Sequence, residues 1–189
     1  MLVAGSTHPE EEEQVLQAFL RLKQEWHDCL LILAPRHPER FDSVADACRV
    51  AGYTVTRRSD STTCADDSAI FLLDSMGELG RYYAAADVAF VGGSLLPFGG
   101  HNVLEPAALG TAVVCGKHTD NFVEVCALLE AGGALQKVAD AAELAQVVSA
   151  LLADSNERDR LGQIGREIVR QHRGATQRTL AIVARTLAA

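Results

Sequence analysis

The chain has 189 residues, a length that one hydrophobic core can serve, so we expect a single α/β-sized domain. Apolar residues make up 48% of the chain and charged residues only 22%, which excludes a disordered protein. No apolar run reaches the roughly 18 residues that a membrane-spanning helix needs. The formal net charge of −8 argues against binding to nucleic acid through phosphate contacts. We therefore expect a soluble globular protein with no nucleic-acid partner.

The five cysteines include no C-x-x-C pair, and their odd number favours neither a disulfide framework nor a zinc ribbon. Cys29 and Cys115 border or lie in apolar, strand-like runs, where a small buried side chain is the expected role. We interpret the cysteines as cytoplasmic thiols.

Short apolar runs alternate with longer amphipathic stretches, which predicts βαβ units and a mostly parallel sheet covered on both faces. The expected strands are residues 2–4, 30–34, 53–56, 70–73, 88–91, 112–115 and 134–136. The expected helices begin near Pro9 and continue with residues 40–51, 77–85, 102–109, 121–131, 141–153, 157–172 and 175–187.

The turn after the first strand reads Gly5-Ser6-Thr7-His8-Pro9. It lacks the G-x-G-x-x-G fingerprint, so the sequence does not support a dehydrogenase-type NAD site. Ser6 or Thr7 is the expected cap of the first helix. The glutamates at positions 10 to 13 place negative charge where a phosphate would otherwise sit, so we expect an anion to bind at a different helix start.

A glycine-rich loop, GGSLLPFGGHNVLE, runs from Gly92 to Glu105 and enters a helix near His101 or Asn102. Its glycines allow close backbone approach, and no acid precedes Glu105, so the loop has the composition of a phosphate-binding turn. Glu105 is then well placed to accept hydrogen bonds from ribose hydroxyls. The alternative is a glycine-rich loop without a site, with Glu105 on a solvated face.

Polar residues follow the ends of several expected strands, and the carboxyl ends of parallel strands share the edge where ligands bind. These residues are Ser6, Thr7 and His8, Arg36 and His37, the segment 74–78, Ser94 and His101, and Lys117, His118 and Asn121.

Two other kinds of site lack support in the sequence. Four of these edge residues are histidines, yet no H-E-x-x-H or short-spaced pair supports a metal site built from them. No G-x-S-x-G elbow marks a nucleophile either, since Ser94 lies in GGSLL. We expect neither a metal nor a catalytic nucleophile in this chain.

Four segments carry a family resemblance: GSTHPEEEE at 5–13, LAPRHPERF at 33–41, LLDSMGELGRYYAAADVAFVGGSL at 72–95 and FGGHNVLEPAALGTAVVCGKHTDNF at 98–122. Together and in this order they resemble the C-terminal half of bacterial 3-deoxy-D-manno-octulosonic acid (Kdo) transferases. That family has the GT-B glycosyltransferase fold, in which two Rossmann-like domains face each other across a cleft. The resemblance implies a three-layer α/β domain over residues 1–189, with a parallel sheet, helices on both faces and a helical extension from about residue 157. The N-terminal acceptor domain would be absent.

The resemblance implies a donor site for CMP-Kdo. Arg36, with His37 beside it, would face the donor phosphate as a fixed cation. Glu105 would hold the ribose. The segment Met76, Gly77 and Glu78 would border the cytosine, Gly99, Gly100, His101 and Asn102 would hold the phosphate, and Ser6, Thr7 and His8 would lie beside the donor sugar. Gly93, Ser94 and Asn121 complete the expected nucleotide-binding set.

Two positions depart from the family pattern, with Glu10 where glycine is common and Val103 where proline is common. The geometry of the first turn and of the helix start after the glycine-rich loop is therefore expected to shift.

The family transfers Kdo from CMP-Kdo to a lipid A precursor, lipid IVA, in lipopolysaccharide synthesis at the cytoplasmic face of the inner membrane. The general base and the lipid-facing surface belong to the N-terminal half, so the resemblance implies a chain that binds nucleotide without turnover. CMP-Kdo would be the substrate, with no cofactor. Residues 156–189 carry seven arginines and three acids. Arg166, Arg170, Arg173 and Arg178 would lie on a solvated face, meet the N-terminal domain or meet an anionic membrane surface.

Two alternatives stay open at this point. The chain could be the donor domain of another GT-B enzyme, such as a UDP-sugar transferase or a UDP-N-acetylglucosamine 2-epimerase. It could also be a non-catalytic nucleotide-binding module, because a fold alone does not define a function.

Overall fold

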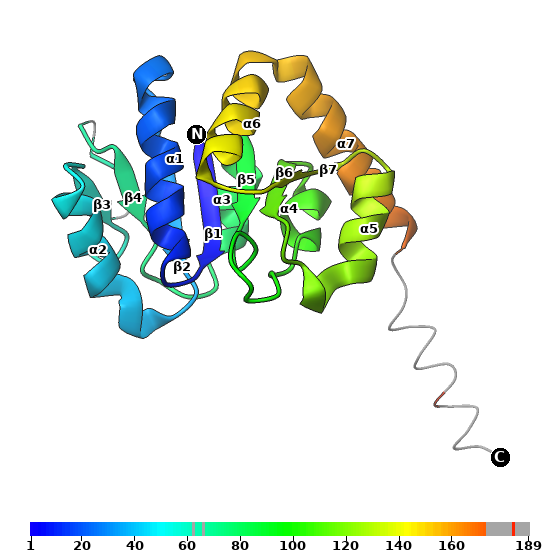
Figure 1. Cartoon of the computed structure of the whole chain (residues 1–189), viewed down its shortest axis with the longest axis horizontal. Helices are drawn as coiled ribbons and strands as arrows, with labels where there is room; N and C mark the ends of the chain where they lie inside the picture. The colour runs from blue at the N-terminus through cyan, green and yellow to red at the C-terminus, as the bar shows by residue number, and fades with distance from the viewer. Residues whose placement is uncertain (62, 66, 173–182, 184–189) are drawn as a thin grey trace.

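The computed structural model describes residues 1–61, 63–65, 67–172 and 183, and within them it shows a seven-stranded sheet (Figure 1). The strand order is β3-β4-β2-β1-β5-β6-β7, and every pair is parallel. The strands are β1 Leu2–Thr7, β2 Leu31–Pro35, β3 Val55–Arg57, β4 Ile70–Leu72, β5 Val88–Val91, β6 Ala112–Gly116 and β7 Leu135–Val138. The predicted parallel α/β sheet is confirmed.

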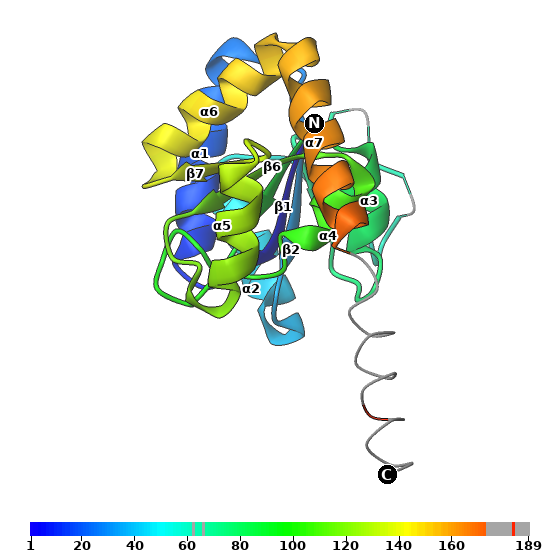
Figure 2. The same cartoon turned by 90° about the vertical axis from the view of Figure 1, so that its right-hand side faces the viewer.

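Helices cover both faces of the sheet. They are α1 Glu11–Glu25, α2 Phe41–Val50, α3 Leu79–Ala85, α4 Leu104–Leu109, α5 Val123–Ala131, α6 Ala141–Ala153 and α7 Ser155–Gln171, with short 3-10 turns at Pro38–Arg40 and Asp120–Phe122. Figure 2 shows α1 and α6 on one side of the sheet and α3 and α4 on the other, with α7 beside α4. The arrangement has the three layers expected of a Rossmann-like domain.

The core follows from the strand alternation, because successive side chains point to opposite faces. Leu2 and Ala4 of β1 pack with Phe19 of α1, whereas Val3 between them packs with Tyr83 of α3 on the other face. Central strands buried on both faces explain why the strand segments read as continuous apolar runs. No helix in the described part of the chain has both the length and the apolar character needed to cross a membrane.

Two helix starts differ from the prediction. The first helix begins at Glu11, after Glu10 at φ 67°, and has no side-chain cap, so the predicted capping by Ser6 or Thr7 is wrong. The physical reason is that β1 continues through Thr7, which places both hydroxyls a turn too early. The helix after the glycine-rich loop begins at Leu104, where the N–H donates to Asn102 Oδ1 at 3.0 Å. The predicted last helix, 175–187, lies outside the described residues apart from Val183.

Of the four C-terminal arginines singled out from the sequence, two lie within the described residues. Arg166 donates a hydrogen bond to the Leu109 carbonyl, and Arg170 pairs with Glu167 at 2.7 Å. Both side chains therefore have partners inside this domain. Arg173 and Arg178 lie outside the described residues, so their predicted contact stays a prediction.

Candidate functional site

A cavity of about 220 Å³ lies at the carboxyl ends of the strands. It is lined by Ser6, Ala34, Pro35, Arg36, Leu73, Ser75, Met76, Gly77, Leu79 and Glu105. These residues come from the ends of β1 and β2, the segment after β4 and the first turn of α4. The structure therefore brings Ser6, Arg36, Met76, Gly77 and Glu105 to one cavity, as the strand-end argument predicts.

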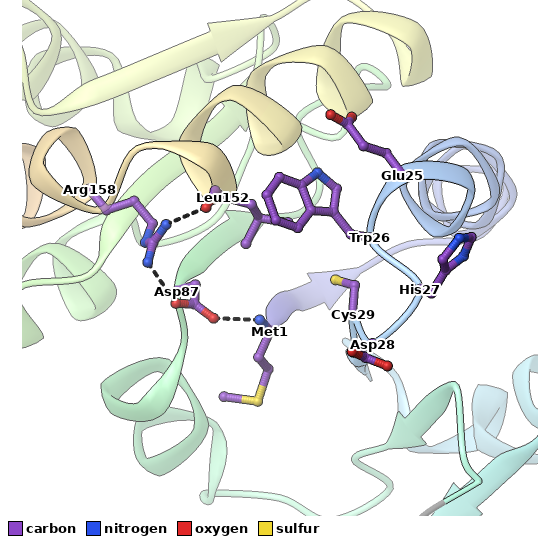
Figure 3. A pocket seen from close by; sticks show the side chains of 9 residues that line it. All are labelled: Met1, Glu25, Trp26, His27, Asp28, Cys29, Asp87, Leu152 and Arg158. Atoms are coloured by element: carbon purple, nitrogen blue, oxygen red, sulfur yellow. Dashed lines mark hydrogen bonds and ion pairs between the residues drawn. The ribbon is translucent and has the colours of Figure 1, made fainter.

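A larger cavity, of about 400 Å³, lies at the opposite edge of the sheet (Figure 3). Its lining includes Trp26 and Cys29, and Asp87 at its wall accepts hydrogen bonds from the Met1 amino group at 2.5 Å and pairs with Arg158 at 3.2 Å. Met1, Cys29 and Asp87 precede β1, β2 and β5, so this cavity lies at the amino ends of the strands. It is separate from the predicted ligand edge.

Arg36 supplies a cation at the rim of the carboxyl-edge cavity. Its backbone N–H donates to the Thr7 carbonyl at 2.9 Å, which ties the end of β2 to the end of β1. Its side chain is exposed and has no ion-pair partner among the described residues. An unpaired guanidinium at the mouth of a cavity is suited to bind a phosphate or carboxylate in bidentate fashion.

Ser6 and Thr7 take different positions at the end of β1. Ser6 lines the cavity with φ 57°, a left-handed conformation that is costly outside glycine and concentrates at functional sites. Thr7 is only 1% exposed, and its hydroxyl is buried without a hydrogen-bond partner in the described structure. Thr7 therefore lies beneath the surface and does not line the cavity as expected; its carbonyl instead positions Arg36.

Three of the strand-end histidines form one cluster beside Arg36. The Nε2 atoms of His8 and His101 are 2.8 Å apart, and their rings are stacked with centroids 5.0 Å apart. Phe98 stacks on His8 at 4.4 Å, and His37 meets His8 edge-on at 5.2 Å. The histidine after β6, His118, lies at the same edge, with its backbone N–H donating to the Ser94 carbonyl at 2.9 Å, but its ring makes no stacking contact with this cluster among the described residues. Within the described residues, no group of three or more His, Cys, Asp or Glu side chains could hold a metal ion.

The clustered imidazoles are poor bases in the free protein. Burial, together with the nearby His8, Arg36 and His37, lowers the pKa of His101 from 6.5 to about 4. Burial also lowers the pKa of His8, against the opposing effect of the Glu11 carboxylate. At neutral pH both rings are therefore uncharged and can share a single Nε2–H between them.

Glu11, in the acidic stretch after β1, has a structural role that the sequence did not predict. Glu11 is fully buried, and its carboxylate accepts the N–H groups of Gly93 at 2.6 Å and of Ser94 and Leu95 at 2.9 Å each. It also accepts the His8 N–H at 3.2 Å. An acid of the protein therefore occupies the turn after β5 that a phosphate occupies in other nucleotide-binding folds. The sequence features that could have indicated this contact are the acidic residues at the start of α1 and the Gly-Gly-Ser stretch after β5.

Gly93 and Ser94, both expected in the nucleotide-binding set, have their donors engaged inside the protein. Their N–H groups bond to Glu11, and the Ser94 hydroxyl donates to the Val91 carbonyl at 2.6 Å while accepting the Gly116 N–H at 2.7 Å. Ser94 is 1% exposed and joins β5 to β6. These two residues hold the loop in shape, and their predicted contact with nucleotide stays a prediction.

The second part of the loop keeps free donors. Gly99 and Gly100 have φ of 90° and 77°, and Gly100 donates to the Gly93 carbonyl at 2.7 Å. Asn121 holds the turn through its N–H to the Gly99 carbonyl at 2.9 Å and its side-chain amide to the Phe98 carbonyl at 3.3 Å. Among the described residues, the N–H groups of the three residues before α4 have no acceptor; they belong to His101, Asn102 and Val103.

The segment before α3 forms another wall of the site. Gly77 turns the chain at φ 81°, and Met76 is 62% exposed at the cavity. The Glu78 carboxylate accepts hydrogen bonds from Ser75 Oγ at 2.5 Å and Arg58 at 3.1 Å, which lower its pKa. Since its carboxylate is paired, Glu78 offers a ligand its backbone groups.

Glu105 completes the site from the first turn of α4. A Cβ added to Gly80 would lie 3.0 Å from Glu105 Oε1, so the small residue leaves room for that carboxylate beside α3. The cavity lining includes the free Arg36 cation and the Glu105 carboxylate, which is suited to hydroxyl groups, and two uncharged imidazoles lie near the cation.

Known proteins share this architecture. A solved structure of the C-terminal CMP-Kdo binding domain of WaaA from Acinetobacter baumannii matches with a TM-score of 0.85 and 34% identity, covering 89% of this chain and 88% of that one. The 3-deoxy-D-manno-octulosonic acid transferase of Haemophilus influenzae is 43% identical over 96% of this chain. That of Bordetella pertussis is 41% identical over 80%.

The alignments cover 43% and 36% of those two relatives, so the chain spans less than half of their length. The family model of group 1 glycosyl transferases matches residues 7–168. The chain therefore belongs to the group 1 glycosyl transferases, and its fold is that of a CMP-Kdo binding domain.

Proposed function

We propose that this chain is the donor-binding half of a Kdo transferase and that it binds CMP-Kdo in the carboxyl-edge cavity. The observation that carries the proposal is that the free Arg36 guanidinium and the Glu105 carboxylate line the same cavity. That arrangement occurs in a domain that resembles a CMP-Kdo binding domain over nearly its whole length.

Each residue has a role that fits its geometry. Arg36 binds the phosphate, whose negative charge it neutralises. Glu105 accepts hydrogen bonds from the ribose hydroxyls, and the backbone around Met76 and Gly77 reads the polar edge of cytosine. The free N–H groups of residues 101–103 add donors for the phosphate or the donor sugar.

In the reaction proposed for the full-length enzyme, the bond from the anomeric carbon of Kdo to the CMP phosphate breaks, and a hydroxyl of the lipid A precursor forms the new bond. CMP leaves with the electron pair, and the site stabilises its charge. The donor is the substrate, and the proposal needs no cofactor. In this proposal the base that takes the hydroxyl proton would come from the part of the full-length enzyme that this chain does not span.

The enzyme would work at the cytoplasmic face of the bacterial inner membrane, where its lipid acceptor lies. This chain alone would bind the donor without turning it over.

Calorimetric titration of this chain with CMP and with UDP tests the proposal. We expect CMP to bind with a millimolar or lower dissociation constant and UDP to bind more weakly. We expect Glu105→Ala to weaken CMP binding about tenfold, the effect of one lost pair of hydrogen bonds. Glu13→Ala is the control, since Glu13 is exposed on α1. Preference for UDP would favour another GT-B activity, and no binding of either nucleotide would contradict the donor site.

A further inference from the structure

The rings of His8 and His101, two titratable groups near Arg36, meet through Nε2 atoms 2.8 Å apart, and the proposed binding roles do not use them. His8 follows β1 and His101 precedes α4, and their rings meet over Gly93, where an added Cβ would lie 2.9 Å from His101 Cδ2 and 3.4 Å from His8 Cδ2. Only glycine at this position, with φ 68°, lets both rings pack so closely.

An Nε2–Nε2 hydrogen bond needs one ring to donate and the other to accept. A proton added at Nδ1 of the donating ring leaves this bond intact and makes it charge-assisted, hence stronger. A second proton would remove the acceptor and break the contact. The pair can therefore hold one extra proton and no more.

The charges around the pair oppose this extra proton while the cavity is empty. His8 is faced by Glu11 from α1 and by Arg36 and His37 from the segment after β2, and His101 is faced by the same Arg36 and His37. The Glu11 carboxylate favours the proton but is shared among backbone donors, and His37 lies 3.7 Å from Glu39. Burial, with a smaller contribution from the unpaired Arg36, outweighs the effect of the Glu11 carboxylate, since the pKa of both rings is lowered.

A bound anion shifts this balance toward the extra proton, because its negative charge offsets that of Arg36 and attracts the proton directly, while the effect of burial remains. We propose that the His8–His101 pair takes up one proton when an anionic nucleotide occupies the Arg36 cavity, and thereby supplies positive charge that stabilises the departing nucleotide phosphate. The proton comes from solvent, and it returns to solvent when the nucleotide leaves. This inference rests on the proposed function.

The test needs a ligand whose own charge does not change with pH. A phosphomonoester such as CMP titrates near pH 6, so the probe is the methyl phosphodiester of cytidine 5′-phosphate, which keeps one negative charge between pH 5.5 and 7.5. Titration calorimetry in buffers of different ionisation enthalpy counts the protons taken up. We expect net uptake near pH 6 and a dissociation constant about three- to tenfold lower at pH 5.5 than at pH 7.5, within the tenfold per pH unit of a one-proton linkage.

Substitutions test whether the proton is taken up by the His8–His101 pair or by another group. In His101→Gln and His8→Gln we expect no proton uptake and a dissociation constant that does not change with pH. His27→Gln is the matched control, because His27 lies at the opposite edge of the sheet and its ring Nδ1 bonds to the Lys23 carbonyl, away from Arg36. Since a ring deletion can disturb the loop, histidine Cε1–H resonances of the unmodified chain are followed as well, and those of His8 or His101 should titrate at higher pH with ligand bound.

Two results would overturn the inference while leaving the proposed function standing. The first is tight binding of the phosphodiester with no proton uptake. The second is uptake that survives in both variants of the pair and disappears in His37→Gln, which would assign the proton to His37. Absence of binding at every pH would overturn the proposed function together with the inference.

Discussion

The Glu11 carboxylate accepts the backbone N–H of Gly93 at 2.6 Å, across 82 positions of the chain. Through the same carboxylate, α1 is joined to the N–H groups of Ser94 and Leu95. Three converging backbone donors would suit a phosphate, yet a side chain of the protein fills the position. The proposed ligand would therefore bind at Arg36 and the donors before α4. The same carboxylate holds the His8 turn against the loop that carries His101.

We expect Glu11→Gln to lower the free energy of unfolding by about 2–4 kcal/mol, since the amide would turn an N–H toward buried N–H groups. Urea unfolding measures the change. The control is Glu13→Gln, in the same helix turn but exposed, which should change the free energy of unfolding by less than about 0.5 kcal/mol. Equal stability of the two variants would show that the Glu11 contacts are not needed for the fold.

Gly5 is packed directly against Tyr83. An added Cβ would lie 2.0 Å from the tyrosine Oη and 2.9 Å from Leu79 Cδ2. Because Tyr83 is buried, the ring cannot move away freely, and we expect Gly5→Ala to destabilise the chain by about 1–3 kcal/mol. Thermal unfolding checks this.

Gly165→Ala is the control for that substitution. Its added Cβ would meet Ala107 at an ordinary 3.4 Å within α7, so we expect no loss of stability. A similar loss in both variants would contradict the packing argument at Gly5.

Acid should destabilise the domain through His101. Its pKa is about 4 in the folded chain and 6.5 as the ordinary value, so between these pH values the unfolded chain binds more protons. Stability from this group is complete above pH 6.5 and falls as pH drops toward 4. We expect the free energy of unfolding to drop by about 1–2 kcal/mol from pH 7 to pH 4.5, allowing for partial exposure of the ring. His101→Gln should flatten this dependence in urea unfolding; an unchanged slope would contradict the assignment.

Arg36→Gln should weaken CMP binding about tenfold and reduce its dependence on salt, because one charge-assisted contact is lost. Calorimetry at low and high salt measures both effects. The control is Arg49→Gln, since Arg49 pairs with Asp46 on the surface of α2, away from the cavity. Binding that is insensitive to Arg36 would place the phosphate elsewhere.

Local pattern explains which parts of the fold were predictable. Strands such as Val88–Val91 are continuous apolar runs buried on both faces, and the apolar stripe of α1, including Val15, Phe19 and Leu22, is buried as its spacing predicts. Helix starts were less predictable. The start of α1 depends on how far β1 continues, and that of α4 depends on the turn at Gly99 and Gly100.

The sequence by itself determined the α/β class, the edge of the sheet where polar residues gather, and the family, because these follow from periodicity and from motifs contiguous in the chain. Only the tertiary structure decided that Glu11 occupies the turn after β5, that Ser94 joins two strands, and that His8 meets His101. Those contacts join segments at or after the ends of β1, β5 and β6, which are distant in sequence and come together only because these strands are neighbours in the folded sheet. Their energies depend on the strand order and on buried side-chain geometry, which no local pattern encodes.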